Sequence, residues 1–222
     1  MAAPPRLALF DCDGTLVDSL AAAHGAMNAA CLSLGVDPPS EAEHRSVFGV
    51  PVLAQMTRLF PVLEPARHQA LADSFFHHHR SANQLEPLYA GAREAIRAIE
   101  AANWLLGIAT AKSGRGLQQT LDRHGLHRHF LTLQTADTNP AKPNPAMALN
   151  AMRVLGVDAE NTVMIGDSVY DMEMARHAGV LPLGVAWGYH DAKALTAAGA
   201  RAIAPNFAAL PDMLAELIPC GS

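Results

Sequence analysis

Hydrophobic and polar positions follow two different patterns along this chain of 222 residues. From about residue 86 onward, short apolar runs typical of buried strands alternate with segments whose apolar residues recur at helical spacing. One more apolar run lies near the N-terminus. The pattern predicts strands at 6–10, 104–109, 130–133, 162–165, 181–186 and 201–204, and helices at 92–102, 114–124, 145–155, 170–177, 192–198 and 210–217. This alternation indicates an α/β fold with a mostly parallel sheet and helices on both faces.

Residues 18–85 differ, because no strong strand interrupts their helical periodicity. Helices are expected at 19–34, from Ser40 onward, at 52–60 and at 65–81. Ser40 followed by Glu43 is a capping-box pattern, which marks the N-terminus of a helix. We therefore predict a small all-helical domain, residues 18–85, inserted into an α/β core domain that comprises residues 1–17 and 86–222.

The composition excludes several classes of partner. The net charge is −5 and no basic stripe is present, so neither nucleic acid nor an anionic membrane is expected to bind. No apolar run approaches the roughly 20 residues of a membrane span, and MAAPPR does not resemble a secretory signal. Cys12, Cys31 and Cys220 are scattered, which favours a cytoplasmic protein without a disulfide framework. The sequence does not indicate the oligomeric state.

The first apolar run ends in two carboxylates, in the stretch LALFDCDGTLVDS. Asp11 and Asp13 are two positions apart, so an extended backbone directs both side chains to one side and Cys12 to the other. Gly14 allows a sharp turn directly after them. Like charges at the end of a buried strand raise one pKa and cost stability. A bound divalent cation removes this conflict by neutralising the pair.

Polar residues follow three other predicted strands. Thr110 and Ala111 come after LLGIA, where a hydroxyl and backbone N–H groups can hold a phosphate. Lys142 lies beside two prolines in AKPNP and can neutralise a phosphoryl group. Asp167 and Asp171 lie one helical turn apart in IGDSVYD, so both can face one point. Because ligands of such sheets bind beyond the carboxyl ends of the strands, these residues and the first aspartate pair are expected to form one site.

The order D-x-D, T, K, G-D-x-x-x-D resembles the haloacid dehalogenase superfamily, whose four motifs match FDCDGTLVDS, Thr110, Lys142 and GDSVYD. The resemblance implies a Rossmann-like core, and residues 18–85 resemble the small cap that this superfamily inserts after its first motif. DGTLVDS, LYAG at 88–91 and VAWGYH at 185–190 are similar to the phosphoglycolate phosphatase-like subgroup. Ala90 and Ala111 depart from residues common in relatives, which affects the prediction of fine specificity only.

The resemblance also implies a phosphatase that works through an aspartyl-phosphate. Asp11 would be the nucleophile, and Asp13 would protonate the leaving oxygen and then activate water. Mg²⁺ would be bound by the carboxylate of Asp11, the backbone carbonyl of Asp13 and Asp167. Asp171 and Gly14 would support this arrangement. An acid at position 13 argues against haloalkanoic acid dehalogenase activity, because that subgroup lacks it.

The same resemblance assigns the groups that hold the substrate. Thr110, the backbone of Ala111 and Lys142 would bind phosphoryl oxygens. The substrate would be a small phosphorylated metabolite, with 2-phosphoglycolate favoured. The cap would supply specificity, and its segment RSVFGVP makes Arg45 and Gly49 the candidates. The successive residues His77-His78-His79 point in three directions on a helix, so packing and solvent contact are expected of them rather than a shared metal ion.

Alternatives remain open at this point. A sugar-phosphate mutase uses the same aspartate pair, although mutase relatives tend to carry valine where this chain has Thr15. A pyrophosphatase or nucleotidase of the same superfamily is another alternative. A non-enzymatic phospho-receiver also groups aspartates, threonine and lysine at strand ends. Its acceptor aspartate, however, follows an internal strand, whereas the D-x-D-G-T of this chain follows the first strand.

Overall fold

The computed structural model describes residues 4–81 and 86–219. The strands are β1 (Arg6–Phe10), β2 (Trp104–Thr110), β3 (Thr132–Thr135), β4 (Thr162–Gly166), β5 (Leu181–Val185) and β6 (Ala202–Ala204). The α-helices are α1 (Leu20–Ser33), α2 (Glu41–Ser46), α3 (Val52–Leu59), α4 (Pro65–Ser81), α5 (Ala92–Ala101), α6 (Gly114–His124), α7 (Ala146–Leu155), α8 (Val169–Ala178), α9 (Ala192–Ala197) and α10 (Leu210–Leu217). Each predicted element is present, with its ends within two residues of the prediction. None of the described helices has the length and apolarity that a membrane span requires.

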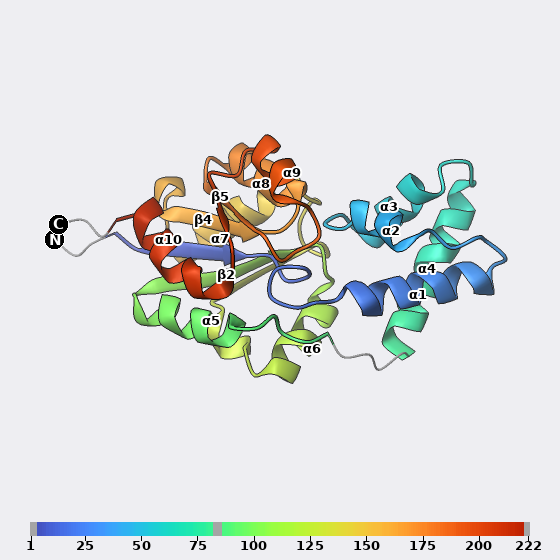
Figure 1. The fold of residues 1–222 in the computed structure, drawn as a ribbon, viewed down its shortest axis with the longest axis horizontal. Helices are drawn as coiled ribbons and strands as arrows, with labels where there is room; N and C mark the ends of the chain where they lie inside the picture. The colour runs from blue at the N-terminus through green and yellow to red at the C-terminus, as the bar shows by residue number, and fades with distance from the viewer. Residues whose placement is uncertain (1–3, 82–85, 220–222) are drawn as a thin grey trace.

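The strands form one parallel sheet in the order β3-β2-β1-β4-β5-β6. The first strand lies in its interior, where Phe10 pairs with Ile108 of β2 and with Ile165 of β4. Since all strands run in one direction, the residues that directly follow β1, β2 and β4 meet at one edge of the sheet. Helices α1–α4 lie beyond that edge, at one end of the molecule (Figure 1).

Apolar clusters cover both faces of the sheet and hold its central strands in place. Leu7 and Leu9 face α7 and α8, whereas Ala8 and Phe10 face α5 and α10, as the two-residue period of a strand requires. Burial on both faces explains the continuous apolar run of β1. Each fully buried Leu or Phe contributes about 1.5–3 kcal/mol. The carboxyl end of β1 is thereby a rigid support for the residues that follow it.

Helices α1–α4 have an apolar cluster of their own, which includes Met27, Met56, Leu71 and Phe75. The predicted capping box is confirmed at the start of α2, where the side chains and backbone N–H groups of residues 40 and 43 bond reciprocally. The two connections to the α/β part lie side by side, since Val17 bridges to residue 88. The boundary predicted at residue 85 lies outside the described residues.

The third strand begins later than the apolar pattern predicts. Phe130, at the predicted start, packs inward before β3 begins, and its ring meets the ring of Phe10 edge-on with 6.2 Å between the centroids. The strand itself has the sequence TLQT and lies at the edge of the sheet. An edge strand needs fewer apolar residues than a central one, so hydrophobicity alone placed its start two residues early.

Candidate active site

Asp11 lies directly after β1, and its carboxylate meets three other charged side chains. The backbone N–H of Cys12 donates to Oδ1 of Asp11 at 2.6 Å, and Nζ of Lys142 lies 3.1 Å from Oδ2. Carboxylate oxygens of Asp11, Asp167 and Asp171 lie within 4.8 Å of one another. The structure thus brings together four residues from three distant segments of the sequence, at the edge of the sheet where they were expected. Cys12 is buried in the apolar core, as its alternation with the acids predicts.

Lys142 is held by an aspartate of α8 as well as by Asp11. Its Nζ donates to Oδ1 of Asp171 at 2.6 Å, and both side chains are inaccessible to solvent. The other oxygen of Asp171 accepts hydrogen bonds from the N–H and Oγ of Ser168, which caps α8. Although burial disfavours the charged ammonium, the neighbouring carboxylates raise the pKa of Lys142, so it stays protonated. Asp171 therefore fixes the position of the lysine.

Asp167 follows β4 and is oriented by two groups that the sequence reasoning did not identify. Its Oδ1 accepts from Oγ1 of Thr15 at 2.8 Å, and its Oδ2 accepts from the backbone N–H of Tyr189 at 2.9 Å. Gly14 adopts φ +77°, and a Cβ atom on it would lie 2.2 Å from Oδ2 of Asp167. Only glycine lets the turn after β1 approach that carboxylate so closely. Thr15 and Tyr189 lie within the motifs DGT and WGYH, and this position in the sequence is the signal that could have identified them.

The buried carboxylates suit a divalent cation. Burial, together with the nearby acids and against the opposing effect of Lys142, raises the pKa of Asp11 to about 7. Burial and the neighbouring Asp11 raise the pKa of Asp167 well above its usual value. Three carboxylates face one ammonium here, so negative charge is in excess. Oxygen ligands with unbalanced negative charge are the donor set that Mg²⁺ prefers, so these residues fit such an ion.

The carboxylate of Asp13 has a different partner. Its Oδ1 lies 2.7 Å from Nζ of Lys112, which also contacts the carboxylate of Glu86. Neither Lys112 nor Glu86 was identified from the sequence. Lys112 had a usable signal, since it lies two positions after Thr110 at the same strand end. Glu86 had none, because it lies outside every motif.

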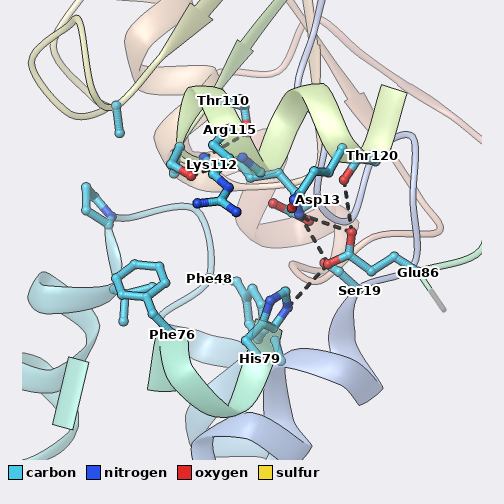
Figure 2. A pocket seen from close by; sticks show the side chains of 18 of the residues that line it. Asp13, Ser19, Phe48, Phe76, His79, Glu86, Thr110, Lys112, Arg115 and Thr120 are labelled. Atoms are coloured by element: carbon cyan, nitrogen blue, oxygen red, sulfur yellow. Dashed lines mark hydrogen bonds and ion pairs between the residues drawn. The ribbon is translucent and has the colours of Figure 1, made fainter. Parts of the chain in front are cut away.

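Asp11 and Asp13 line a pocket of about 850 Å³ between the α/β part and helices α1–α4 (Figure 2). Thr110 and Ala111 also line it, and Thr110 is otherwise buried. The lining on the side of the helices is mostly apolar, with Ala23, Phe48, Gly49, Val50, Pro51, Val52, Phe75 and Phe76, and it also includes the polar Gln55 and His79. The volume is within the range of small-molecule sites. The arrangement offers a polar end with acids and a hydroxyl, and an apolar end.

Gly49 lies where the helical segment touches the core. It has φ +94°, and a Cβ atom there would lie 2.7 Å from Oγ of Ser168. The ring of the preceding Phe48 is 4.3 Å from the ring of Tyr189, centroid to centroid. Gly49 therefore permits a close approach to the end of β4, and it lines the pocket as well. On α3, Arg58 contacts the hydroxyl and the ring face of Tyr170.

The structure places Arg45 away from this pocket. Its side chain is exposed and lines a smaller recess with Tyr189 and His190. The main pocket instead contains Arg115, from the first turn of α6, whose guanidinium is directed toward the space beside Phe76 (Figure 2). Arg115 was not identified from the sequence, because an arginine on a helix is most often a solvated surface residue.

Comparisons with known proteins agree with this geometry. Residues 8–185 match the family model described as haloacid dehalogenase-like hydrolase. The chain is 31% identical over 209 residues to a "Probable phosphatase IndB" of Dickeya dadantii, covering 90% of each chain. It is 30% identical to a phosphoglycolate phosphatase of Vibrio parahaemolyticus, covering 96% of this chain and 94% of that protein.

Solved structures show the same fold. A structure described as a predicted phosphoglycolate phosphatase from Haemophilus somnus superposes with a TM-score of 0.86 at 22% identity, covering 94% of this chain and 97% of that one. A predicted phosphatase from Clostridium acetobutylicum gives a TM-score of 0.87 at 20% identity, covering 96% of this chain and 100% of that one. At these identities the likeness concerns the fold.

Proposed function

Because this chain belongs to the haloacid dehalogenase-like hydrolases, we propose that it is a Mg²⁺-dependent phosphatase that hydrolyses a small phosphomonoester through an aspartyl-phosphate. One observation carries the proposal. The carboxylate of Asp11 faces the ammonium of Lys142 at 3.1 Å and also lines the pocket beneath α1–α4. A nucleophile, a cation for the phosphoryl group and space for a substrate thus coincide. The phosphatase relatives support hydrolysis of a phosphoester.

In the first half of the reaction, an oxygen of Asp11 attacks phosphorus and the bond between phosphorus and the leaving oxygen breaks. Asp13, protonated at this stage, gives its proton to the leaving oxygen, so that an alcohol departs. Lys142 and Thr110 hold the phosphoryl oxygens, where charge gathers in the transition state. The product is an acyl phosphate, a mixed anhydride of the Asp11 carboxyl group and phosphate.

In the second half, Asp13 is a carboxylate and accepts a proton from water. The water oxygen attacks phosphorus, the bond to Asp11 breaks, and inorganic phosphate leaves. Asp11 returns as a carboxylate and Asp13 returns in its protonated form. Both residues line the same pocket, so both have access to one bound phosphoryl group.

Asp11, Asp167 and the backbone carbonyl of Asp13 would hold Mg²⁺, with Asp171 as the residue that orients the site through Lys142. The ion would neutralise the crowded carboxylates and the phosphate, so that an anionic nucleophile can approach an anionic substrate. Asp11 must be ionised to attack. The ammonium of Lys142 favours the ionised form of Asp11, because it opposes the rise in the pKa of Asp11 that burial causes.

The favoured substrate is 2-phosphoglycolate or a similar carboxylated phosphoester. Several relatives bear the name phosphoglycolate phosphatase. The guanidinium of Arg115 forms no ion pair within the described residues and lines the pocket with Asp11. An arginine is well suited to bind a carboxylate in two-point fashion. We therefore assign recognition of the substrate carboxylate to Arg115, while Arg45 remains a prediction from the sequence alone.

The proposal includes a reducing, cytoplasmic compartment. Cys12 and Cys31 are free thiols buried in the structure, and buried unpaired cysteines are typical of proteins that remain in a reducing environment. Cys220 lies outside the described residues.

The test is phosphate release from a panel of phosphorylated metabolites, with Mg²⁺ and with excess chelator. We expect turnover with Mg²⁺ and its loss with chelator. Asp11→Asn should abolish turnover, because a neutral amide oxygen is too weak a nucleophile to form the acyl phosphate. The control is Asp158→Asn, an exposed acid outside the pocket, which should retain wild-type activity. Substantial Mg²⁺-dependent turnover by Asp11→Asn would contradict the proposal.

A further inference from the structure

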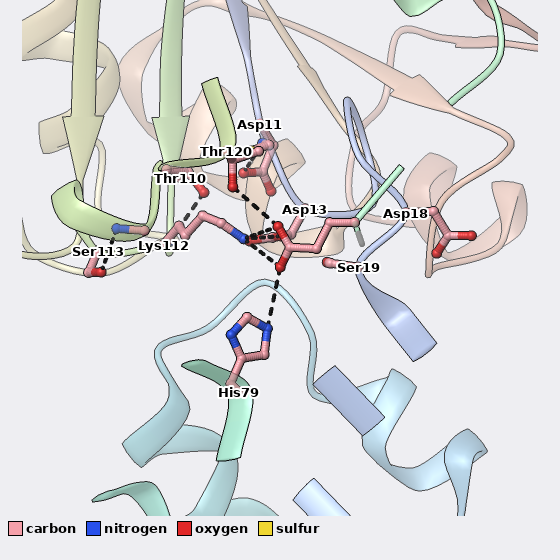
Figure 3. Close-up of polar contacts among 12 residues, drawn as sticks. Asp11, Asp13, Asp18, Ser19, His79, Thr110, Lys112, Ser113 and Thr120 are labelled. Carbon is pink, nitrogen blue, oxygen red and sulfur yellow. Dashed lines mark hydrogen bonds and ion pairs between the residues drawn. The ribbon is translucent and has the colours of Figure 1, made fainter. Parts of the chain in front are cut away.

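The carboxylate of Asp13 is held by a charged network that reaches into the helical segment. Nζ of Lys112 lies 2.7 Å from Oδ1 of Asp13 and 3.3 and 3.2 Å from the two carboxylate oxygens of Glu86 (Figures 2 and 3). The side chains of Lys112 and Glu86 are 12% and 6% exposed, against 26% for Asp13. A mostly buried ion pair therefore lies directly behind a more accessible carboxylate.

Glu86 has more polar contacts than the carboxylate of an ordinary surface ion pair has. It accepts a hydrogen bond from Oγ1 of Thr120 at 3.2 Å, and Nε2 of His79 lies 3.3 Å from its Oε1. Its backbone carbonyl bonds Nε2 of His124 at 2.8 Å. Although burial disfavours its charge, the contacts with His79 and Lys112 lower the pKa of Glu86 to about 2. Glu86 is thus a fixed anion.

His79 connects this anion to the helices beyond the sheet. It belongs to α4, and its ring stacks on the ring of Phe75 with 5.5 Å between centroids and 22° between planes. Phe75 is part of the apolar cluster of α1–α4. A continuous series of contacts therefore runs from that cluster through His79, Glu86 and Lys112 to Asp13. The sequence predicted packing and solvent contact for His79, and the packing on Phe75 agrees with this. The contact with Glu86 was not predicted.

We propose that Glu86 is a positioning residue, which holds Lys112 against Asp13 and, through His79, makes the direction of the Asp13 carboxylate depend on the position of α4. The inference rests on the proposed phosphatase function and names residues that act on its acid–base group. Within the described residues, Lys112 is the hydrogen-bond partner of the Asp13 carboxylate. Without Glu86 the lysine side chain has no second anchor on that side.

The physical reason is the short range of proton transfer. A general acid must lie within about 2.6–3.2 Å of the atom that it protonates, and a displacement of about 1 Å can cost about 100-fold in rate. Asp13 lies in a turn rather than in the strand, since β1 ends at Phe10. An anchored ammonium beside it is a simple way to fix its carboxylate. A purely structural ion pair would affect stability, but not the dependence of rate on the leaving group.

The first test compares two substrates in Glu86→Gln. Ethyl phosphate has a poor leaving group and needs protonation, whereas p-nitrophenyl phosphate does not. We expect kcat/KM for ethyl phosphate to fall about 10- to 100-fold, a part of the 10²–10⁴ that general acid–base catalysis supplies, while p-nitrophenyl phosphate loses less than about threefold. The matched control is Glu100→Gln, a glutamate paired with His129 at 2.9 Å and outside the pocket, which should leave both rates unchanged. Equal losses on the two substrates, or no loss, would overturn the inference.

The second test separates the contact with α4 from folding of the core. His79→Ala should show the same preference for p-nitrophenyl phosphate, and His79→Gln should restore the wild-type ratio, because its amide can still donate to Glu86. His78→Ala, the neighbouring histidine on the same helix, is the control. If His79→Ala behaves like His78→Ala, the coupling to α4 is wrong. If the wild-type protein releases phosphate neither from these two esters nor from the metabolite panel, the proposed function fails and the inference with it. If the wild-type protein is active and Glu86→Gln keeps the wild-type ratio of the two rates, the inference alone is overturned.

Discussion

Gly14 occupies a crowded position in the site, between the carboxylate of Asp167 and the ring of Tyr189. Gly14→Ala combines two penalties: about 1–2 kcal/mol for the left-handed backbone and about 1–3 kcal/mol for displacing packed neighbours. We expect loss of stability in urea unfolding and loss of most phosphatase activity. Gly35→Ala is the control, because Gly35 has φ +64° and no atom within 4 Å of the added Cβ. Gly35→Ala should show only the penalty for the left-handed backbone and keep its activity. If the two variants lost stability and activity equally, a role of Gly14 in placing Asp167 would be contradicted.

Arg115 allows a prediction about substrate recognition. Arg115→Ala should raise KM for 2-phosphoglycolate about tenfold, which corresponds to about 1.4 kcal/mol and is typical of a lost charged hydrogen bond. The KM for ethyl phosphate, which has no carboxylate, should not change. Steady-state kinetics on both substrates give the answer. Arg45→Ala is the comparison: if that variant, rather than Arg115→Ala, raises KM for 2-phosphoglycolate selectively, the assignment to Arg115 is wrong.

At the level of residues, the sequence located groups on the segments that follow strands, although Lys142 lies seven positions after the end of β3. Asp11, Lys142 and Asp167 were predictable because chain order and strand direction together place them at one edge of the sheet. Glu86 and His79 were not predictable. His79 reaches the site through the packing of α4 against the core, and Glu86 reaches it through its contact with Lys112. A single sequence holds no signal for such contacts.

Among the elements, the three helices α1, α2 and α3 are joined by a directional series of hydrogen bonds. Gln55 of α3 donates its amide to the carbonyl of Val50 at 2.9 Å, which leaves its Oε1 to accept from Nε2 of His44 at 3.3 Å. Nδ1 of His44 then accepts from Nδ1 of His24, 3.4 Å away, and Nε2 of His24 accepts from Asn28 at 3.3 Å. The link between the two histidines requires Nδ1 of His44 to carry no proton, because a doubly protonated imidazole has no acceptor nitrogen. His44 must therefore be neutral for the series to be complete.

This arrangement predicts a pH-dependent stability. Burial and the adjacent His24 lower the pKa of His44 from 6.5 to about 4. Between these values the unfolded chain binds more protons than the folded one, so the free energy of unfolding falls as the pH falls. The contribution of His44 to stability should be fully present above pH 6.5 and decrease by about 2 kcal/mol by pH 5.

Urea unfolding of the wild-type protein and of His44→Gln at pH 7.5 and pH 5 measures this contribution. The glutamine variant should lose less stability over that interval, because it has no imidazole to protonate. His68→Gln is a suitable control, since His68 also lies in this helical segment and bonds a backbone carbonyl. An identical pH dependence in wild type and His44→Gln would contradict the prediction.

The elements also show what hydrophobic patterns can and cannot locate. Helices with clear end signals were predicted well, such as α6, which begins after Ser113 and ends before Gly125. The start of β3 was misplaced because the ring of Phe130 belongs to the core but not to the strand. The hydrophobic pattern indicates which residues are buried, but a buried residue need not lie in a strand.

For the whole molecule, two sets of contacts join helices α1–α4 to the α/β part beside the pocket. Gly49 and Phe48 meet Ser168 and Tyr189, and His79 contacts Glu86. The sequence predicted a helical segment above the site but not these points of contact. They depend on how two separately packed apolar clusters fit together, which no local pattern encodes.

Metal binding should stabilise the whole molecule, because the proposed ligands follow β1 and β4 and lie beside α8. An ion that binds the folded chain but not the unfolded one adds RT ln(1 + [L]/Kd), or about 2.7 kcal/mol at 100 times Kd. Without it, burial and the repulsion between neighbouring acids both disfavour the ionised carboxylates, as the raised pKa values of Asp11 and Asp167 indicate. We therefore expect Mg²⁺ to raise Tm by several degrees and excess chelator to reverse the increase.

Asp167→Asn makes this prediction specific to the site. The substitution replaces an acid of the cluster with a neutral amide, so the variant should be at least as stable as the wild type in chelator, provided that the amide oxygen accepts from the N–H of Tyr189 and the amide NH2 donates to Oγ1 of Thr15. It should also gain little from Mg²⁺, because a neutral amide is a poorer ligand for a hard cation. Differential scanning calorimetry of both proteins with and without the ion distinguishes this from a general salt effect, which would raise both Tm values alike. A wild-type increase in the variant would mean that the ion binds elsewhere and that the acidic cluster is not its site.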